Sequence, residues 1–162
     1  MAKQAGRMVR GLVVGLCVTQ ALDWVSIALY DVESAQERDQ ENAARGQRAA
    51  YERAFERMAQ RLGKQPTDEQ IARWGWRFHK VFGVLGGPAY LLLRRRFPGL
   101  RWGAGLLFGT LFFLVVDELL VPLTGLTPGP RAFGVKVHAR GAAAHLAYGV
   151  AAETAARLLD RA

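Results

Sequence analysis

Carboxylates and imidazoles recur inside the apolar segments of this 162-residue chain. Desolvated carboxylates and imidazoles can exchange protons with one another, and their pKa values shift by several units when water is removed. Within a membrane helix such groups face protein, water or a bound ion, because contact with lipid is costly. The residues of interest, here named the polar cluster, are Asp23, His79, Asp117, Glu118, His138 and His145.

Four kinds of chemistry suit the polar cluster. The first is mutual neutralisation, in which carboxylates pair with protonated histidine or with Arg77, Lys80 and Arg140. The second is a proton or cation site. His79 and His145 could also be the axial ligands of a haem, although no attachment motif accompanies them. A metal site of His138, His145 and the acidic pair lacks a compact ligand spacing such as HExxH, so neither a cofactor nor a metal is predicted.

Residues 97–128 contain the longest apolar run, with Asp117 and Glu118 near its far end. About twenty apolar residues in a helix span a bilayer core of ~30 Å. We therefore predict an all-α integral membrane protein with four transmembrane helices and a single membrane domain over residues 1–162. The predicted spans are residues 9–30, 76–96, 101–122 and 135–157.

The first apolar segment, residues 9–30, follows basic residues and so also fits a secretory signal peptide with Ser26-Ile27-Ala28 as its cleavage site. Its apolar run continues past the usual length of such a peptide, and it contains Asp23 and Trp24. These features favour a retained helix. Cys17, the single cysteine, lies within this segment and is predicted to be a small core residue.

Residues 31–73 change in composition to Glu, Arg, Gln and Ala. Apolar residues recur there at helical spacing, which predicts one extramembrane amphipathic helix over 31–62, between the first and second spans. This helix either docks a partner or packs on the bundle or the membrane interface. Gly63-Lys64-Gln65-Pro66 ends it, and Thr67 with Gln70 predicts a capping box for the next helix.

The placement of Lys and Arg predicts the orientation of the spans. Positive charge is dense in the N-terminal arm, in residues 94–101 and in the C-terminal tail, whereas residues 31–73 carry nine acidic against eight basic residues. Both termini are therefore predicted to be cytoplasmic, in a bacterial inner (plasma) membrane. Counting ~1.5 Å per residue puts one ionisable group of each span roughly 8–15 Å below the outer surface, namely Asp23, His79, Asp117 and His145. Glu153 lies on the inner side.

Glycines four residues apart predict close helix packing, because they let another backbone approach. A further glycine lies on the stripe of the last span that is expected to face the bundle. These packing glycines are Gly11, Gly15, Gly83, Gly87, Gly105, Gly109 and Gly149. They suit a tight bundle and a homo-oligomer or a partner in a membrane complex. The net charge of +8 is spread over the flanks of the spans, so the expected partner is the lipid bilayer and not a nucleic acid.

The motifs FPGLRWGAGLLFG and PLTGLTP, followed by His145-Leu146 and by Glu153 with trailing arginines, resemble the YagU family of small bacterial inner-membrane proteins. The resemblance covers about residues 1–30 and 75–160. It implies a multi-span inner-membrane protein without established enzymatic activity and with a role linked to acid tolerance. The chain departs from the family pattern at Asp117, where a histidine is expected.

The leading functional hypothesis is a non-enzymatic inner-membrane protein whose outward-side acid and histidine cluster responds to or conducts protons or ions, in envelope or acid-stress tolerance. One alternative is a structural or assembly subunit of a larger membrane complex. The other is a bis-histidine b-type haem protein. The sequence has no nucleophile elbow, P-loop or dinucleotide-binding motif, so no enzymatic activity is predicted.

Overall fold

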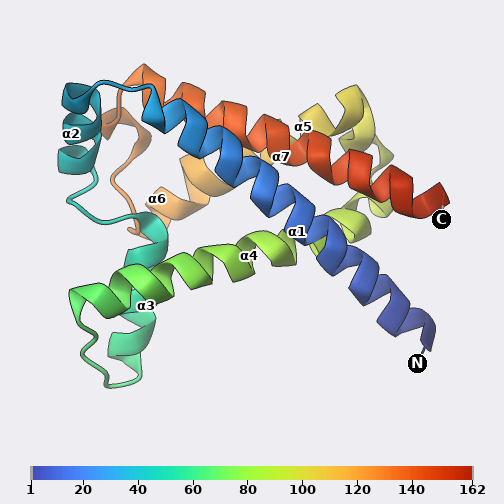
Figure 1. Ribbon diagram of the computed structural model, residues 1–162, viewed down its shortest axis with the longest axis horizontal. Helices are drawn as coiled ribbons and strands as arrows, with labels where there is room; N and C mark the ends of the chain where they lie inside the picture. The colour runs from blue at the N-terminus through green and yellow to red at the C-terminus, as the bar shows by residue number, and fades with distance from the viewer. Residues whose placement is uncertain (1, 162) are drawn as a thin grey trace.

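A computed structural model describes residues 2–161 of the chain, and all of its regular elements are helical. The all-α prediction is therefore confirmed over this range. Long helical stretches run between two ends of the molecule (Figure 1). They are α1 (Ala2–Asp31), α4 (Asp68–Arg96), α7 (Val135–Arg161), and the stretch that joins α5 (Leu106–Phe112), the π-helix η2 (Phe113–Leu120) and α6 (Val121–Leu123).

Helix α1 packs against both α4 and α7, and α5 packs against α7. Figure 1 shows both ends of the chain on one side of the molecule, which we call the terminal end. The opposite side, the loop end, carries the short helices α2 (Ala35–Ala44) and α3 (Ala50–Arg61). Residues 31–73, which we call the charged segment, lie on the bundle, because helix α3 packs against α4.

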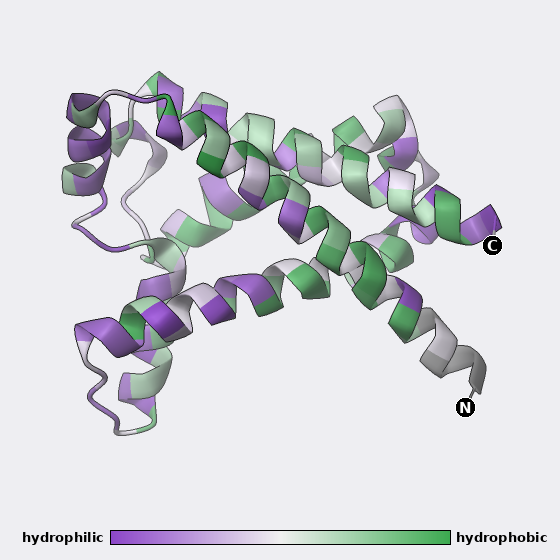
Figure 2. Cartoon of the chain, in the orientation of Figure 1, coloured by the Kyte–Doolittle hydropathy of each residue, from purple (hydrophilic) through white to green (hydrophobic). Residues whose placement is uncertain are grey.

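Two helical stretches are long and apolar enough to cross a membrane, Met8–Asp31 and Pro98–Leu123. Figure 2 shows mainly hydrophobic residues along α1 and mainly hydrophilic ones on α2. Helices α4 and α7 also expose apolar side chains, among them Leu85, Leu92 and Val150, but they carry more charged residues than the other two stretches. Two of the four predicted spans thus have the length and composition of membrane helices.

The predicted single helix over 31–62 is wrong, because the structure divides it into α2 and α3. Gly46 and Gln47 lie in the connection with φ of 64° and 60°, in the left-handed region that a right-handed helix excludes. The predicted start of the following helix is confirmed. Thr67 accepts from the backbone N–H of Gln70, and the Gln70 side chain accepts from the backbone N–H of Thr67.

The third predicted span begins as a regular helix at Leu106, five residues later than expected. Residues before it form the 3₁₀ segment η1 (Pro98–Gly105), which is interrupted where Gly103 and Ala104 have φ of 60° and 56°. Further along, the backbone widens into the π-helix η2, after which the N–H of Val121 donates to the carbonyl of Val116, five residues back. Such π segments are rare and frequently occur at functional sites.

Glycine permits the close crossing of α1 and α4. A Cβ atom added to Gly87 would lie 2.2 Å from the backbone N of Gly15 and 2.3 Å from the carbonyl O of Gly11. One added to Gly83 would lie 2.6 Å from Oγ1 of Thr19. These distances are shorter than any real Cβ contact, so the crossing requires residues without side chains.

A second crossing of the same kind joins α5 to α7. A Cβ atom on Gly149 would lie 2.3 Å from the carbonyl O of Gly105, and one on Gly109 would lie 2.2 Å from the carbonyl O of His145. In the stripe of α7 that was predicted to face the bundle, His145, Gly149, Ala152 and Glu153 are buried, while His138 and Ala142 are partly buried. That orientation of α7 is confirmed.

The core lies between α1, α4, α5 and α7 around Tyr90 and Tyr148, the largest fully buried side chains. Tyr90 packs on Phe108 with a ring-centroid distance of 4.6 Å. The prediction that Cys17 belongs to the core is wrong, because its side chain is exposed. The buried face of α1 is taken by other residues, Val14 and Val18.

Candidate functional site

A cavity of about 600 Å³ lies at the loop end, bounded by α3, α4, η2 and α7. Most of its lining is apolar, as in the side chains of Phe82, Phe112 and Val121. Into this apolar setting the structure brings five members of the polar cluster, His79, Asp117, Glu118, His138 and His145. The sixth member, Asp23, joins the others through His79. Apolar cavities with a few convergent polar groups are typical of binding sites.

Asp23 is buried on α1, with 4% of its surface exposed, and contacts two bases on α4. Its Oδ1 lies 3.1 Å from Nε2 of His79, and its Oδ2 accepts from Nζ of Lys80. The His79 ring packs against Trp76 and Tyr51, each with a centroid distance of 5.2 Å, and these two rings also contact each other. The structure therefore pairs Asp23 with Lys80, one of the three bases proposed from the sequence.

His145 faces Asp117 at a distance too long for a hydrogen bond. Its Nδ1 lies 2.9 Å from the carbonyl O of Gly141, and because a carbonyl only accepts, Nδ1 carries the proton. The other nitrogen, Nε2, is 3.7 Å from Oδ2 of Asp117. In neutral His145 this nitrogen is an acceptor, and so is an ionised carboxylate. One added proton would turn this contact of two acceptors into an attractive pair.

The surroundings of this pair differ on its two sides. The His145 ring is buried, with its centroid 5.5 Å from that of Phe112 and 5.6 Å from that of Phe113. The Asp117 side chain is 43% exposed and lines the cavity. Asp117 lies in the π-helix, where the wider backbone alters the direction of the side chains relative to an α-helix. The acid therefore lies at the cavity surface and the base behind it.

Glu118 and His138 form a second pair that already holds its proton. Nδ1 of His138 lies 2.7 Å from Oε1 of Glu118, and Nε2 lies 3.0 Å from the carbonyl O of Pro130. The carbonyl requires a proton on Nε2, so the contact with Glu118 contains either a second imidazole proton or a protonated carboxyl. With His145 neutral and Asp117 ionised, the two acid–histidine pairs of the cavity differ by one proton.

Two of the bases proposed to neutralise the cluster are engaged elsewhere, which corrects that part of the prediction. Arg140 donates to Glu33 and Glu41, both at 2.5 Å, and so ties α7 to the loop end. Arg77 lies over the ring of Trp74, 4.4 Å from its centroid. Glu33 and Glu41 belong to the charged segment, and the fold brings both of them to Arg140.

At the terminal end Glu153 is fully buried and accepts from several donors at once. Tyr90 Oη is 2.5 Å from its Oε2, while Nε of Arg157 and Nε of Arg101 are 2.7 Å and 3.1 Å from its Oε1. Nη2 of Arg94 lies 3.4 Å from the same Oε1. These partners were not predicted from the sequence, although the spacing of Arg157 four residues after Glu153 was a signal.

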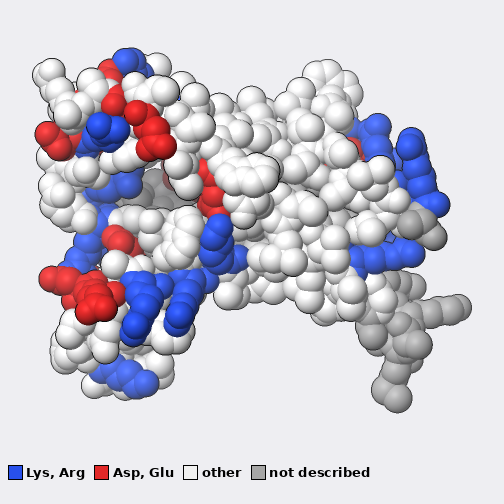
Figure 3. All heavy atoms as spheres, in the orientation of Figure 1, with Lys and Arg blue, Asp and Glu red and all other residues white. Residues whose placement is uncertain are grey.

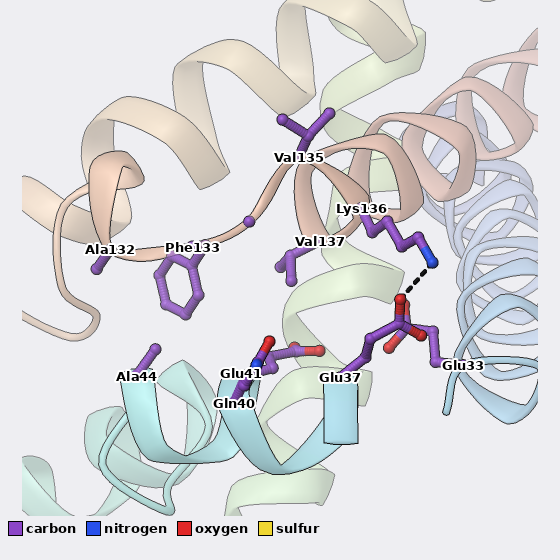
Figure 4. A pocket seen from close by; sticks show the side chains of 11 residues that line it. Glu33, Glu37, Gln40, Glu41, Ala44, Ala132, Phe133, Val135, Lys136 and Val137 are labelled. Atoms are coloured by element: carbon purple, nitrogen blue, oxygen red, sulfur yellow. Dashed lines mark hydrogen bonds and ion pairs between the residues drawn. The ribbon is translucent and has the colours of Figure 1, made fainter. Parts of the chain in front are cut away.

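A smaller cavity of about 370 Å³ lies between α2 and the segment that precedes α7 (Figure 4). Glu37 and Lys136 form an ion pair at its edge. The hydrogen bond from Lys136, with further hydrogen bonds from Ser34, lowers the pKa of Glu37 to about 2. This cavity has its acids paired, because Glu33 and Glu41 bind Arg140.

The described residues contain no group of three or more His, Cys, Asp or Glu side chains that could hold a metal ion. Within residues 2–161, Nδ1 of His79 and Nε2 of His145 make no hydrogen bond, so they are the nitrogens that a bis-histidine haem would use. The haem stays an alternative to the prediction that no cofactor is bound, and a visible spectrum tests it. Comparison with protein-family models, with curated proteins and with solved structures gives no match, so the resemblance to the YagU family stays a prediction.

Proposed function

We propose that the chain is a four-span bacterial inner-membrane protein that binds and releases protons at an outward-side cavity. The two most apolar stretches support the membrane location, since their apolar side chains are largely exposed. Exposed apolar residues on α4 and α7 extend this surface around the bundle. Three ionisable groups of the long helices are buried inside the bundle, namely Asp23, His145 and Glu153.

The distribution of charge supports the orientation. Figure 3 shows Lys and Arg gathered at the terminal end with little acid, and both signs of charge mixed at the loop end. Positively charged loops are retained in the cytoplasm, so the terminal end is inside and the loop end outside. Gln47 is exposed in the turn between α2 and α3. A Gln47→Cys variant in a Cys17→Ala background should react with a membrane-impermeant maleimide on intact cells, and reaction only after permeabilisation would reverse the orientation.

The contact of His145 with Asp117 carries the functional proposal. When His145 is neutral and Asp117 is ionised, two acceptors face each other at 3.7 Å beside an apolar cavity, and the Asp117 side chain is 43% exposed. A proton arriving in the cavity finds a site where it completes a pair, with the neighbouring Glu118–His138 pair as an example of the protonated form. Histidine changes charge near neutral pH, which suits a response to external acid.

Reconstitution into liposomes tests proton handling. Wild-type protein in vesicles under an imposed pH gradient should change the rate at which a trapped pH dye responds. Asp117→Asn should abolish this change while the protein stays folded, because an amide keeps the shape of the side chain but cannot titrate. Asp39→Asn is the matched control, since Asp39 is exposed on α2 and away from the cavity lining. Wild-type vesicles that behave like empty ones would refute proton conduction.

A further inference from the structure

The terminal end carries more positive charge than its acids neutralise. Glu153 and Asp160 are the acids of a cluster in which they bind the guanidinium groups of Arg94, Arg101 and Arg157. Three positive and two negative charges leave one positive charge in excess. We call these five residues the arginine cluster. Arg95 and Arg96 follow Arg94 directly in the chain and are exposed.

Glu153 fixes the direction of two of these arginines. Arg101 and Arg157 come from different elements, η1 and α7, and each approaches the same Oε1 of Glu153 through its Nε, at 3.1 Å and 2.7 Å. With Nε of each side chain bound to Glu153, the terminal Nη atoms remain as further donors. Among residues 6 and 8–161, whose side chains the structure describes, none accepts a hydrogen bond from these Nη atoms. The two side chains are 47% and 49% exposed, so the unused donors reach the surface.

We infer that Arg101 and Arg157 bind the phosphate of an anionic phospholipid in the inner leaflet. Two guanidinium groups held at one oxygen offer pairs of N–H donors, and paired N–H donors are the arrangement that binds a phosphate most strongly. A phosphodiester carries one negative charge and cancels the excess charge of the cluster. The inference rests on the membrane orientation proposed above and is independent of proton binding at the cavity.

The residues that follow the two arginines in the chain suit a lipid and not a soluble phosphate compound. Trp102, adjacent to Arg101, is 72% exposed, and Leu158, adjacent to Arg157, is 61% exposed. Tryptophan favours the level of the headgroups, while leucine is compatible with acyl chains. Basic pockets between membrane helices on the cytoplasmic side are known to bind anionic headgroups. Glu153 acts here as a positioning residue, because it contacts the arginines and not the lipid.

Lipid titration of the full chain in detergent tests the site. Phosphatidylglycerol should raise the midpoint of thermal unfolding and remain bound in native mass spectrometry, whereas phosphatidylcholine should do neither. Replacing both arginines, Arg101→Gln with Arg157→Gln, should weaken phosphatidylglycerol binding by about tenfold or more, because the charge-assisted pairs are lost. The double variant Arg95→Gln with Arg96→Gln removes the same charge from the same end and should bind within about twofold of wild type.

Further measurements separate a lipid site from a free-anion site and from diffuse electrostatic attraction. Inorganic phosphate at millimolar concentration should neither stabilise the protein nor displace the lipid, and equal stabilisation by phosphate would assign the site to a free anion. Arg101→Lys with Arg157→Lys keeps the charge but not the paired donors, so an affinity near that of the glutamine variant supports the proposed geometry. Equal losses in the 95/96 and 101/157 variants would replace the site with diffuse electrostatic attraction. Proton flux in phosphatidylcholine vesicles is measured separately, so failure of either proposal is visible by itself.

Discussion

The polar cluster and the arginine cluster use the same kind of acid with different bases. At the terminal end Glu153 meets guanidinium groups, which keep their charge at every accessible pH. At the loop end Asp117 and Glu118 meet imidazoles, which change charge near neutral pH. A carboxylate in an apolar helix therefore forms either a structural ion pair, when its partner is arginine, or a titratable site, when its partner is histidine.

The clusters also differ in packing. Glu153 is fully buried and its oxygens are saturated by a tyrosine and arginines, so its ionised form is fixed. Asp117 borders a cavity of about 600 Å³ and has one partner at a distance too long for a hydrogen bond. The saturated acid should contribute mainly to stability, and the unsaturated acid mainly to function.

Removing Glu153 should have the largest effect on folding. Glu153→Leu leaves Arg94, Arg101 and Arg157 without their shared acceptor, and breaking a buried ion pair by removing one partner costs ~3–5 kcal/mol. The free energy of unfolding in mixed micelles should fall by that amount. Thr154→Leu, at the exposed neighbouring position, is the control. A loss in the free energy of unfolding no greater than that of the control would contradict a stabilising role for Glu153.

Removing Asp23 should cost less, about 2 kcal/mol, because its partners can turn toward water. Asp23 is buried, as Glu153 is, but its partners His79 and Lys80 are 26% and 34% exposed. Asp23→Leu should therefore destabilise the protein less than Glu153→Leu in the same unfolding assay, which sharpens the comparison between the clusters. A larger loss in the free energy of unfolding for Asp23→Leu than for Glu153→Leu would show that the polar cluster stabilises the bundle more than the arginine cluster does.

Much of the fold follows from periodic patterns in the sequence. Local composition and spacing determine helix formation, the capping box at Thr67 and the inward-facing residues of α7. These features can therefore be predicted from the sequence alone. The division of residues 31–62 at Gly46 and Gln47 depends on backbone conformation. A glutamine with positive φ gives no local signal, because the fold imposes that conformation.

The spacing of residues along the predicted spans puts four members of the polar cluster at one expected depth, but it does not predict which side chains pair. Which base meets which acid depends on helix rotation and on the path of the charged segment, as shown by Arg140, which binds Glu33 and Glu41 instead of Asp117. The η1 turn likewise brings Arg101 to Glu153 through positive φ angles at Gly103 and Ala104. Contacts between distant segments are set by three-dimensional packing, which no spacing in the sequence encodes.

A hydrophobic replacement at Asp117 should have a small effect on stability. The carboxylate is 43% exposed and its only ion pair is long, so Asp117→Leu should change the free energy of unfolding by about 1 kcal/mol or less. The proton response in liposomes should nevertheless disappear. A variant that loses the proton response but keeps its stability would distinguish Asp117, a functional acid, from Glu153, which stabilises the fold. A loss as large as that of Glu153→Leu would remove the distinction between the clusters.

The smallest predicted effect concerns an acid whose partner is a lysine at the surface of the loop end. The pKa of Glu37 is lowered from 4.5 to about 2 by the hydrogen bond from Lys136 and then by those from Ser34 (Figure 4). A lowered pKa in the folded state means that the ionised form stabilises the fold above about pH 4.5, and that this contribution is lost as the pH falls toward 2.

The consequence is local, because Glu37 caps the start of α2. In Glu37→Gln, amide hydrogens in the first turn of α2 should exchange faster than in the wild type above about pH 4.5, and the difference should vanish near pH 2. Asp39→Asn on the same helix is the control, since Asp39 forms no ion pair with the described residues. A difference between wild type and Glu37→Gln that persists unchanged at pH 2 would show that the amide itself disrupts the cap. A difference that follows the pH would confirm that the hydrogen bonds of Glu37 lower its pKa and stabilise the start of α2.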